Sequence, residues 1–325
     1  MKAPIRVAVT GAAGNIAYSL MWMIANGDCF GPDQPVILHL LEITPAMEKL
    51  SGVMMELEDS AHPLVKGIVG TDDANKAFDG VNAVFLVGSR PRTADMNRAD
   101  LIRANGPIFT GQGKALQRAN GDVKILTVGN PCNTNALIAM NSGKDVPQDR
   151  FHAMTRLDHN RSIGQLAKKA GVSFADVKDV AVWGNHSDTM YPDVSRATIG
   201  GKPVTSVLDA AWLKGEFITT VATRGKGIIK ARGASSAASA AQAAVDHMHD
   251  WHLGSDGKIV SMAVASQGWY GVPKGLIYSF PCICKGAGAF EVVSGWDLDD
   301  FAKQKIAANI TELESEKTAV ADLLV

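Results

Sequence analysis

Residues 5–17 read Ile5-Arg6-Val7-Ala8-Val9-Thr10-Gly11-Ala12-Ala13-Gly14-Asn15-Ile16-Ala17. The apolar first half predicts a buried strand, and the apolar pattern from Leu20 to Ile24 predicts a helix directly after the glycines. Glycines at such a turn let the backbone approach a pyrophosphate, whose charge meets free N–H groups and the positive end of the helix dipole. The spacing Gly-x-x-Gly-x-x-Ala is less common than Gly-x-Gly-x-x-Gly, so an ordinary tight turn is the alternative for this segment alone.

Short apolar runs alternate with helical patterns through the first half of the chain. Residues 5–10, 36–41, 81–87 and 124–128 predict strands buried on both faces, as in a parallel sheet covered by helices. A helix is expected to begin after Thr44-Pro45, because apolar residues then recur every three or four positions from Met47 to Leu57. This half of the chain is therefore predicted to be α/β.

The pattern of predicted strands and helices changes after about residue 150. We expect a strand at 177–183 and a hairpin of 194–199 and 203–207 that turns on Gly200-Gly201. Two long helical stretches over 208–249 with a break near Gly225, strands near 259–265 and 276–280, and a terminal helix from Asp297 follow. The prediction is a Rossmann-type parallel-sheet domain over residues 1–153 and a mixed α+β catalytic domain over 154–325, which share an interface.

The composition excludes several classes of protein. The chain has 325 residues, 32 basic and 33 acidic side chains and 46% hydrophobic residues, so it is too apolar to be disordered and has no excess charge to bind nucleic acid. Its four cysteines are too few and too scattered for a disulfide framework and favour a reducing compartment. We find no leader and no stretch of about 20 apolar residues, so a cytoplasmic protein without membrane contact is expected.

Glu42 stands at the end of the second predicted strand. An acidic side chain there can accept hydrogen bonds from the ribose hydroxyls of a dinucleotide and would repel a 2′-phosphate, which favours NAD over NADP. Glu42 lies further from the glycines than the usual ~20 residues, and the insertion at 26–35 explains the difference. The alternative is an ordinary solvated glutamate at a strand end.

Tyr270-Gly-Val-Pro-Lys274 matches the Tyr-x-x-x-Lys pair of extended short-chain dehydrogenases and sugar-nucleotide epimerases. That chemistry needs the two side chains one helical turn apart. Gly271 and Pro273 prevent such a helix, and the motif comes too late in the chain, so we reject this function.

His186 is the histidine best placed for acid–base chemistry. It follows the predicted strand 177–183 in Gly184-Asn185-His186-Ser187, on a loop at a strand end where α/β sites gather. A carboxylate is needed to orient it. Asp158 and Arg161, three residues apart at a predicted helix start, would present a carboxylate and a guanidinium on one face, although a surface ion pair is the alternative.

The other histidines have more ordinary explanations. His247, His249 and His252 do not have the spacing of a zinc site, and we expect them on a solvated helix face. His39 lies in a predicted buried strand, and His159 is adjacent to Asp158 and so points away from it on a helix. No metal site is predicted.

An arginine-rich loop follows the strand at 81–87. Residues 88–98 read Gly-Ser-Arg-Pro-Arg-Thr-Ala-Asp-Met-Asn-Arg, and guanidinium groups at the carboxyl end of a strand indicate an anionic ligand. Arginine can hold a carboxylate with two parallel hydrogen bonds. A solvated basic loop is the alternative.

Taken together, these segments make the chain resemble the malate dehydrogenases of the lactate/malate dehydrogenase superfamily, in the subgroup that includes cytosolic animal and many bacterial enzymes. The resemblance covers the whole chain and rests on six segments in the family order: residues 10–17, 41–45, 91–101, 128–131, 157–161 and 184–187. Two departures, Thr93 and Asp95, leave the conformation of the arginine loop open.

The resemblance implies roles for individual residues. His186 would be the proton acceptor, Asp158 its orienting carboxylate and Arg98 the group that polarises the substrate carbonyl. Other implied substrate contacts are Arg92 with the distal carboxylate, Arg161 with the carboxylate next to the reacting carbon, Asn130, and either Ser235 or Ser236. Implied cofactor contacts are Gly11, Ala12, Ala13, Gly14, Asn15, Ile16, Ala17, Glu42, Asn105, Gln112, Val128, Gly129 and Asn130.

The implied activity is the reversible NAD-dependent oxidation of (S)-malate to oxaloacetate, a reaction of the tricarboxylic acid cycle. A dehydrogenase of another 2-hydroxy acid, such as lactate, is the alternative, because the related lactate dehydrogenases have an uncharged residue in place of Arg92. A non-catalytic NAD-binding protein on the same fold would have no need to keep the His186 cluster. The resemblance also implies a homodimer, with the helix from Met47 to Leu57 as a candidate contact surface.

Overall fold

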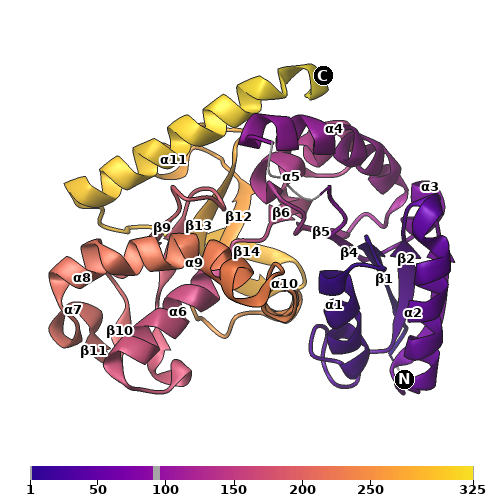
Figure 1. Cartoon of the computed structure of the whole chain (residues 1–325), viewed down its shortest axis with the longest axis horizontal. Helices are drawn as coiled ribbons and strands as arrows, with labels where there is room; N and C mark the ends of the chain where they lie inside the picture. The colour runs from indigo at the N-terminus through magenta and orange to yellow at the C-terminus, as the bar shows by residue number, and fades with distance from the viewer. Residues whose placement is uncertain (1, 91–95, 325) are drawn as a thin grey trace.

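The computed structural model describes residues 2–90 and 96–324, and a nine-stranded sheet runs through the centre of this part of the chain (Figure 1). The strand order is β14-β13-β12-β6-β5-β4-β1-β2-β3. Six of these strands pair in parallel: β1 (Ile5–Thr10), β2 (Val36–Leu41), β3 (Val65–Thr71), β4 (Ala83–Leu86), β5 (Lys124–Thr127) and β6 (Phe151–Ala153). This is the doubly wound order 3-2-1-4-5-6, in which the chain reverses direction across the sheet between β1 and β4.

The helices of the first half are α1 (Asn15–Asn26), α2 (Met47–Asp59), α3 (Ala74–Ala77), α4 (Arg98–Ala115) and α5 (Cys132–Ser142). Strand β1 explains why helices cover both faces of the sheet. Val7 and Val9 pack into one hydrophobic cluster, whereas Ala8 between them packs into the other. Both faces of the strand are buried because successive side chains point to opposite sides of a sheet. The predicted α/β class and the apolar face of α2, with Leu50 and Leu57 buried, are confirmed.

The second half of the chain extends the same sheet with antiparallel strands. These are β12 (Val260–Ala265), which pairs with β6, then β13 (Ile277–Gly286) and β14 (Ala289–Val292). The remaining strands, in two small sheets, are β7 (Val177–Lys178), β8 (Ala181–Trp183), β9 (Tyr191–Asp193), β10 (Thr198–Ile199) and β11 (Lys202–Pro203). The helices are α6 (Arg156–Ala170), α7 (Val204–Val207), α8 (Ala210–Lys214), α9 (Glu216–Arg232), α10 (Ala238–Leu253) and α11 (Asp300–Ala319).

Several predicted elements of the second half were wrong in extent. The hairpin does turn on Gly200-Gly201, but it comprises only β10 and β11, and residues 204–207 form α7 instead of a strand. The predicted strand at 177–183 is divided into β7 and β8 at Asp179, whose φ of 58° is outside the strand region. The helical stretch is interrupted around Gly215 and at 233–237, whereas Gly225 lies inside α9.

The expectation of a solvated position on α10 was wrong for His247, whereas His249 and His252 are partly exposed. His247 is 1% exposed, because α10 packs against α1, α6 and β13 and so is enclosed on several sides. His247 Nε2 lies 3.1 Å from Nδ1 of His152, and the His152 ring stacks on Trp251. Burial lowers the pKa of His247 to about 3 and that of His152 well below its usual range, so both rings are neutral near pH 7.

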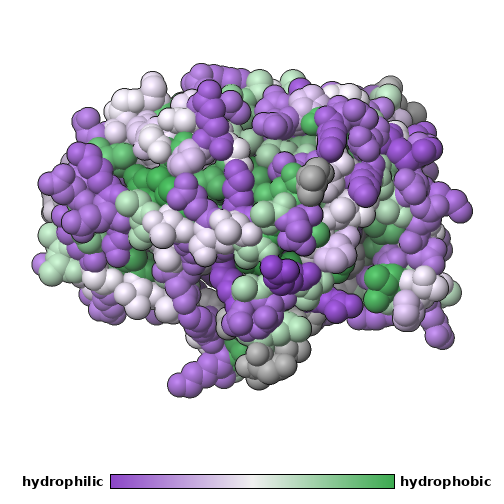
Figure 2. Space-filling view, turned by 90° about the horizontal axis from the view of Figure 1, so that it is seen from above, coloured by the Kyte–Doolittle hydropathy of each residue, from purple (hydrophilic) through white to green (hydrophobic). Residues whose placement is uncertain are grey.

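The surface seen from above is mainly hydrophilic, with smaller hydrophobic patches between the polar side chains (Figure 2). Among the described residues, no helix combines the length and the apolar character needed to cross a bilayer. The four cysteines are buried free thiols.

Candidate active site

A cleft of about 1780 Å³ opens at the carboxyl ends of β1, β2, β4 and β5. Its walls come from both halves of the chain: the loops after these strands on one side, and α6, the loop after β8, α9 and the start of α10 on the other. The cleft thus lies where the strand order reverses, which is where ligands bind in open α/β sheets.

The glycine-rich turn forms one end of the cleft. Gly11 has a φ of 63°, and a Cβ atom there would lie 2.6 Å from the Cα of Gly88 in the loop after β4. The Gly88 N–H donates to the Thr10 hydroxyl at 3.0 Å and holds the two loops together. Only glycine allows this approach, which brings two backbone segments to the edge of the cleft.

Glu42 is fixed beside that turn. Its Oε2 accepts a hydrogen bond from the Ala13 N–H at 3.0 Å, and its Oε1 accepts one from the Ile43 N–H at 2.9 Å. Gly14 precedes α1, and no side chain within the described residues caps the start of this helix. Gly11, Gly14, Asn15 and Ile16 line the cleft, whereas Ala12 and Ala17 are buried in the packing beneath it.

These features fit a bound dinucleotide. An uncapped helix N-terminus offers N–H groups and a positive dipole to a pyrophosphate, and a Cβ at Gly11 would close the cradle. Glu42 lines the cleft directly after β2, at a strand end where an acidic side chain can bind a ribose. Gln112, Val128, Gly129 and Asn130 also line the cleft.

Asn105 does not line the cleft. It is fully buried, accepts a hydrogen bond from the Arg90 N–H at 2.7 Å and donates to the Leu101 carbonyl at 2.9 Å. In this structure Asn105 therefore anchors the start of the arginine loop. Arg92, Thr93 and Asp95 lie outside the described residues, so the predicted distal carboxylate contact has no structural description.

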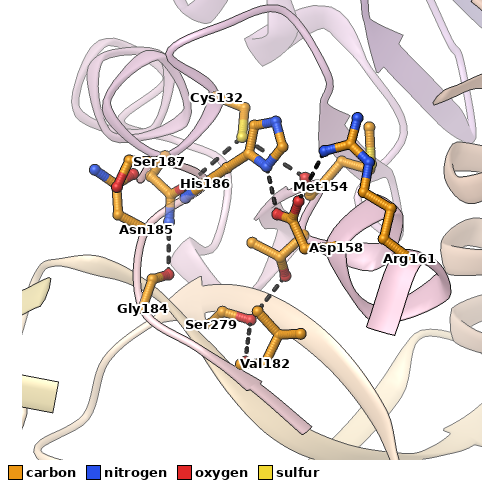
Figure 3. Close-up of polar contacts among 12 residues, drawn as sticks. Cys132, Met154, Asp158, Arg161, Val182, Gly184, Asn185, His186, Ser187 and Ser279 are labelled. Atoms are coloured by element: carbon orange, nitrogen blue, oxygen red, sulfur yellow. Dashed lines mark hydrogen bonds and ion pairs between the residues drawn. The ribbon is translucent and has the colours of Figure 1, made fainter. Parts of the chain in front are cut away.

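His186, Asp158 and Arg161 form one cluster in the opposite wall of the cleft (Figure 3). His186 Nδ1 and Asp158 Oδ2 share a short hydrogen bond, and Arg161 Nη1 donates to Asp158 Oδ1 at 3.2 Å. The Asp158 side chain is 3% exposed, so its charge is compensated by these two partners rather than by water. The predicted placement of Asp158 and Arg161 on one helix face is confirmed, and their ion pair is buried instead of lying on the surface.

Hydrogen bonds from two elements, β13 and α5, hold the turn that carries His186. Gly184 pairs with Ser279 of β13 through both backbone N–H groups, at 3.1 and 2.9 Å. The side chain of Asn133 accepts from the His186 N–H at 3.1 Å and donates to the Gly184 carbonyl at 3.3 Å. The imidazole is therefore carried by a rigid turn, a requirement for acid–base catalysis at a fixed position.

Arg98 begins α4 and also lines the cleft. Its Nε donates to Oε1 of Glu316, a buried carboxylate on α11, at 2.5 Å. Ser235 and Ser236 both line the cleft, in the segment between α9 and α10. Of the predicted substrate contacts within the described residues, Arg98, Asn130, Arg161 and Ser235 thus surround the same space as His186.

Cys132 lies close to this cluster but is chemically inactive there. Burial, together with the charge of Asp158, raises the pKa of its thiol to about 12, so the thiol is protonated at neutral pH. Residues 2–90 and 96–324 contain no group of three His, Cys, Asp or Glu side chains arranged to hold a metal ion.

Four residues that support the site were not predicted from the sequence: Asn133, Ser279, Glu312 and Glu316. None belongs to a motif, and each reaches the site from an element distant in the chain. Glu316 and Arg98 are separated by 218 residues. The i, i+4 spacing of Glu312 and Glu316 on one face of the terminal helix is the only signal in the sequence, and it is equally typical of a solvated face.

Comparison with known proteins agrees with this geometry. Residues 5–152 match the family model for the NAD-binding domain of lactate/malate dehydrogenases, and residues 155–324 match the model for their alpha/beta C-terminal domain. The chain therefore belongs to the lactate/malate dehydrogenase family and is an NAD-dependent oxidoreductase of that type. The fold class and the superfamily predicted from the sequence are confirmed.

Solved structures of this family resemble the chain over nearly its whole length. Malate dehydrogenase from Naegleria fowleri is 47% identical, with a TM-score of 0.96 and 99% of both chains covered. Lactate dehydrogenase from Trichomonas vaginalis, in complex with NADH and oxamate, is 38% identical, with a TM-score of 0.94 over 98% of this chain and 99% of that one. Malate dehydrogenase from Salinibacter ruber, at 23% identity and a TM-score of 0.79, shares the fold, with 98% of each chain covered.

Proposed function

We propose that this protein is a malate dehydrogenase, which interconverts (S)-malate and oxaloacetate with NAD. The observation that carries the reaction type is the buried Asp158, which binds His186 on one oxygen and Arg161 on the other at the wall of the cleft. The observation that favours a dicarboxylate is the presence of Arg92 six residues before Arg98 in the sequence.

Asp158 determines which imidazole nitrogen is available. Because Asp158 occupies Nδ1 of His186, Nε2 is the nitrogen that can accept the hydroxyl proton of malate. When bound, NAD supplies the hydride acceptor. Proton transfer to Nε2 makes His186 cationic, and the adjacent carboxylate stabilises this imidazolium, as the aspartate of a catalytic triad does.

The arginines bind and polarise the substrate. Asp158 takes one terminal nitrogen of Arg161, which leaves the other to bind the carboxylate next to the reacting carbon. In oxaloacetate reduction, Arg98 donates to the carbonyl oxygen, where negative charge develops while His186 returns its proton. One such donor contributes about 3 kcal/mol to the transition state.

Glu42 supports NAD over NADP. Its carboxylate is fixed against the glycine-rich turn by the Ala13 N–H, so a cofactor with a 2′-phosphate would meet a negative charge. Gly11, Gly14, Asn15 and Ile16 would hold the pyrophosphate, with Gln112, Val128 and Gly129 along the rest of the cofactor. Measured KM values for NADH and NADPH test this preference, and equal values would contradict it.

Lactate dehydrogenase activity is the second candidate, favoured by the 38% identity to the Trichomonas vaginalis enzyme. The two functions differ in the charge required at Arg92, because pyruvate lacks the second carboxylate of oxaloacetate. We expect Arg92→Gln to lower kcat/KM for oxaloacetate by at least about 100-fold, the loss of one charged pair, while sparing pyruvate. Initial rates with NADH and both 2-oxo acids measure this, and an unchanged selectivity would refute malate as the substrate.

Three broader statements belong to the same proposal. Residues 1–153 would bind the cofactor and residues 154–325 the substrate, with the cleft between them. The protein would form a homodimer with α2 in the interface, and Met55 on this helix is 59% exposed. Sedimentation equilibrium tests the oligomeric state. The proposed reaction is one of the tricarboxylic acid cycle, and a cytoplasmic location is proposed because four free thiols suit a reducing compartment.

A further inference from the structure

Side chains of the C-terminal helix α11 bind residues of the candidate active site. It crosses the second half of the molecule and ends beside α4 (Figure 1), with contacts to both α4 and α5. Along one face it carries Asn309, Glu312 and Glu316, which all bind groups around the cleft. The proposed mechanism uses none of these three side chains.

Glu316 binds side chains from α4, from α5 and from the loop that carries His186. Its Oε1 accepts from Nε of Arg98 at 2.5 Å and from Nδ2 of Asn185 at 2.8 Å, and its Oε2 accepts from the Thr134 hydroxyl. The Glu316 side chain is 5% exposed. One buried carboxylate oxygen therefore joins the arginine at the start of α4 to the residue immediately before His186.

The contact leaves the substrate-binding end of Arg98 available. A guanidinium has five N–H donors, and Glu316 takes the one on Nε. Nη2 of Arg98 is buried, with no hydrogen-bond partner among the described residues, which is costly unless a ligand completes it. Held by Nε, the guanidinium keeps its two terminal nitrogens for an oxygen in the cleft.

We propose that Glu316 is the positioning residue for Arg98. It fixes the guanidinium against the His186 loop, so that carbonyl polarisation and proton transfer act on the same substrate atom. This inference rests on the proposed function for the role of Arg98. The alternative is that Glu316 serves only to attach α11 to the rest of the molecule.

Glu312 provides the contrast on the same helix. Its Oε2 accepts from the Asn185 side chain, from Ser187 and from Thr189, at 2.8, 2.5 and 2.7 Å. It thus holds the loop that carries His186, as Glu316 does, but its hydrogen bonds go to that loop and not to Arg98. A variant of Glu312 therefore separates general support of the loop from positioning of Arg98.

The main test is Glu316→Gln, with Glu314→Gln as the control. Glutamine has nearly the same shape and can still accept from Arg98 and donate to Thr134, so the substitution removes mainly the charge. We expect kcat and kcat/KM for oxaloacetate to fall together by about 10- to 100-fold, as for a weakened transition-state donor, with the KM for NADH unchanged. Glu314 is exposed on the same helix, so Glu314→Gln should match the wild type.

A double-mutant cycle tests whether Glu316 acts through Arg98. Arg98→Lys keeps the charge but lacks the Nε donor, so adding Glu316→Gln to this variant should cause little further loss of kcat. Adding Glu312→Gln to Arg98→Lys should instead multiply the two separate effects. If Glu316→Gln retains wild-type kcat, or its loss is fully multiplicative with that of Arg98→Lys, the inference is wrong.

A stability cycle covers the case in which Glu316→Gln lowers activity by disturbing the fold. Arg98→Lys leaves the buried carboxylate less well paired and should lower the Tm, and Glu316→Gln added to it should restore part of that loss. Simple addition of the two Tm changes would overturn the pairing. This readout needs no substrate, so an enzyme without oxaloacetate activity would refute the proposed function while the cycle still tests the Arg98–Glu316 pair.

Discussion

At the scale of single residues, the two oxygens of Asp158 bind different groups. Oδ2 binds His186 and Oδ1 binds Arg161, so one buried carboxylate orients both the proposed proton acceptor and the proposed substrate-binding cation. Neither partner can take the place of the other, because each approaches a separate oxygen. Replacement of any one of these three side chains should therefore cost about as much activity as replacement of all three.

We predict that His186→Asn abolishes turnover but not cofactor binding. Asparagine cannot accept the proton, so kcat for oxaloacetate should fall by about 10³-fold or more, as in other enzymes that lose their general base. NADH fluorescence should report an unchanged dissociation constant, since His186 lies in the opposite wall of the cleft from Glu42. Asp158→Asn should cause a similar loss, and the double variant should be no worse than the single ones. Full activity of His186→Asn would exclude its role.

At the scale of elements, sequence patterns succeeded where a strand or helix meets the core on a regular period. The four strands predicted in the first half, observed as β1, β2, β4 and β5, and α2 lie within a few residues of their predicted positions, because buried side chains recur at fixed spacing. Strand β3 was not predicted; its run Val65-Lys-Gly-Ile-Val-Gly-Thr71 contains a lysine and two glycines. The helix break predicted near Gly225 was wrong, because this glycine lies inside α9. Glycine usually ends helices, but in α9 it faces the cleft, where a Cβ would lie 3.6 Å from the Arg161 guanidinium.

Glycine also determines how closely α4 and α5 pack. A Cβ at Gly113 would lie 2.5 Å from the Ala139 carbonyl oxygen and 2.7 Å from the Ser142 Cβ, so the two helices touch at this residue. We expect Gly113→Ala to lower the free energy of unfolding by about 1–3 kcal/mol through overpacking. Urea unfolding of the cofactor-free protein measures this.

Gly111 is the matched control for that prediction. It lies in the same helix and is exposed, and a Cβ atom at this residue would meet no atom of the described chain within 4 Å. Gly111→Ala should raise the free energy of unfolding by up to about 1 kcal/mol, because alanine favours the helix. Equal effects of the two substitutions would show that helix propensity, not the α4–α5 contact, dominates.

At the scale of the whole molecule, one continuous sheet joins the two halves, and its burial isolates several histidines from water. His152, His159 and His247 are all buried, and burial lowers the pKa of each, to about 3 for His159 and His247. The folded state therefore holds them neutral, whereas the unfolded chain protonates them near their ordinary pKa of 6.5. Arg156 is the main charged group that faces His159 and His247, and it acts in the same direction.

This difference in histidine pKa between the folded and unfolded states predicts that the free energy of unfolding falls in acid. Stability from these histidines is fully present above about pH 6.5 and is lost as the pH falls toward 3, by up to about 1.4 kcal/mol per pH unit for each histidine. His247→Gln should reduce the slope between pH 6 and 4. His249→Gln, with a side chain 42% exposed on the same helix, should leave it unchanged. Urea unfolding across this range measures both, and equal slopes in the wild type and His247→Gln would contradict the prediction.

The sequence by itself determined the parallel sheet, the glycine-rich turn and the choice of side chains proposed for catalysis, because each is encoded in residues close together in the chain. It also placed Asp158 and Arg161 on one helix face. Only the tertiary structure decided that His186 meets Asp158, that Glu316 binds Arg98 from 218 residues away, and that His247 is buried. These contacts depend on how α6, α10 and α11 pack around the sheet, and the local spacing of residues does not encode that packing.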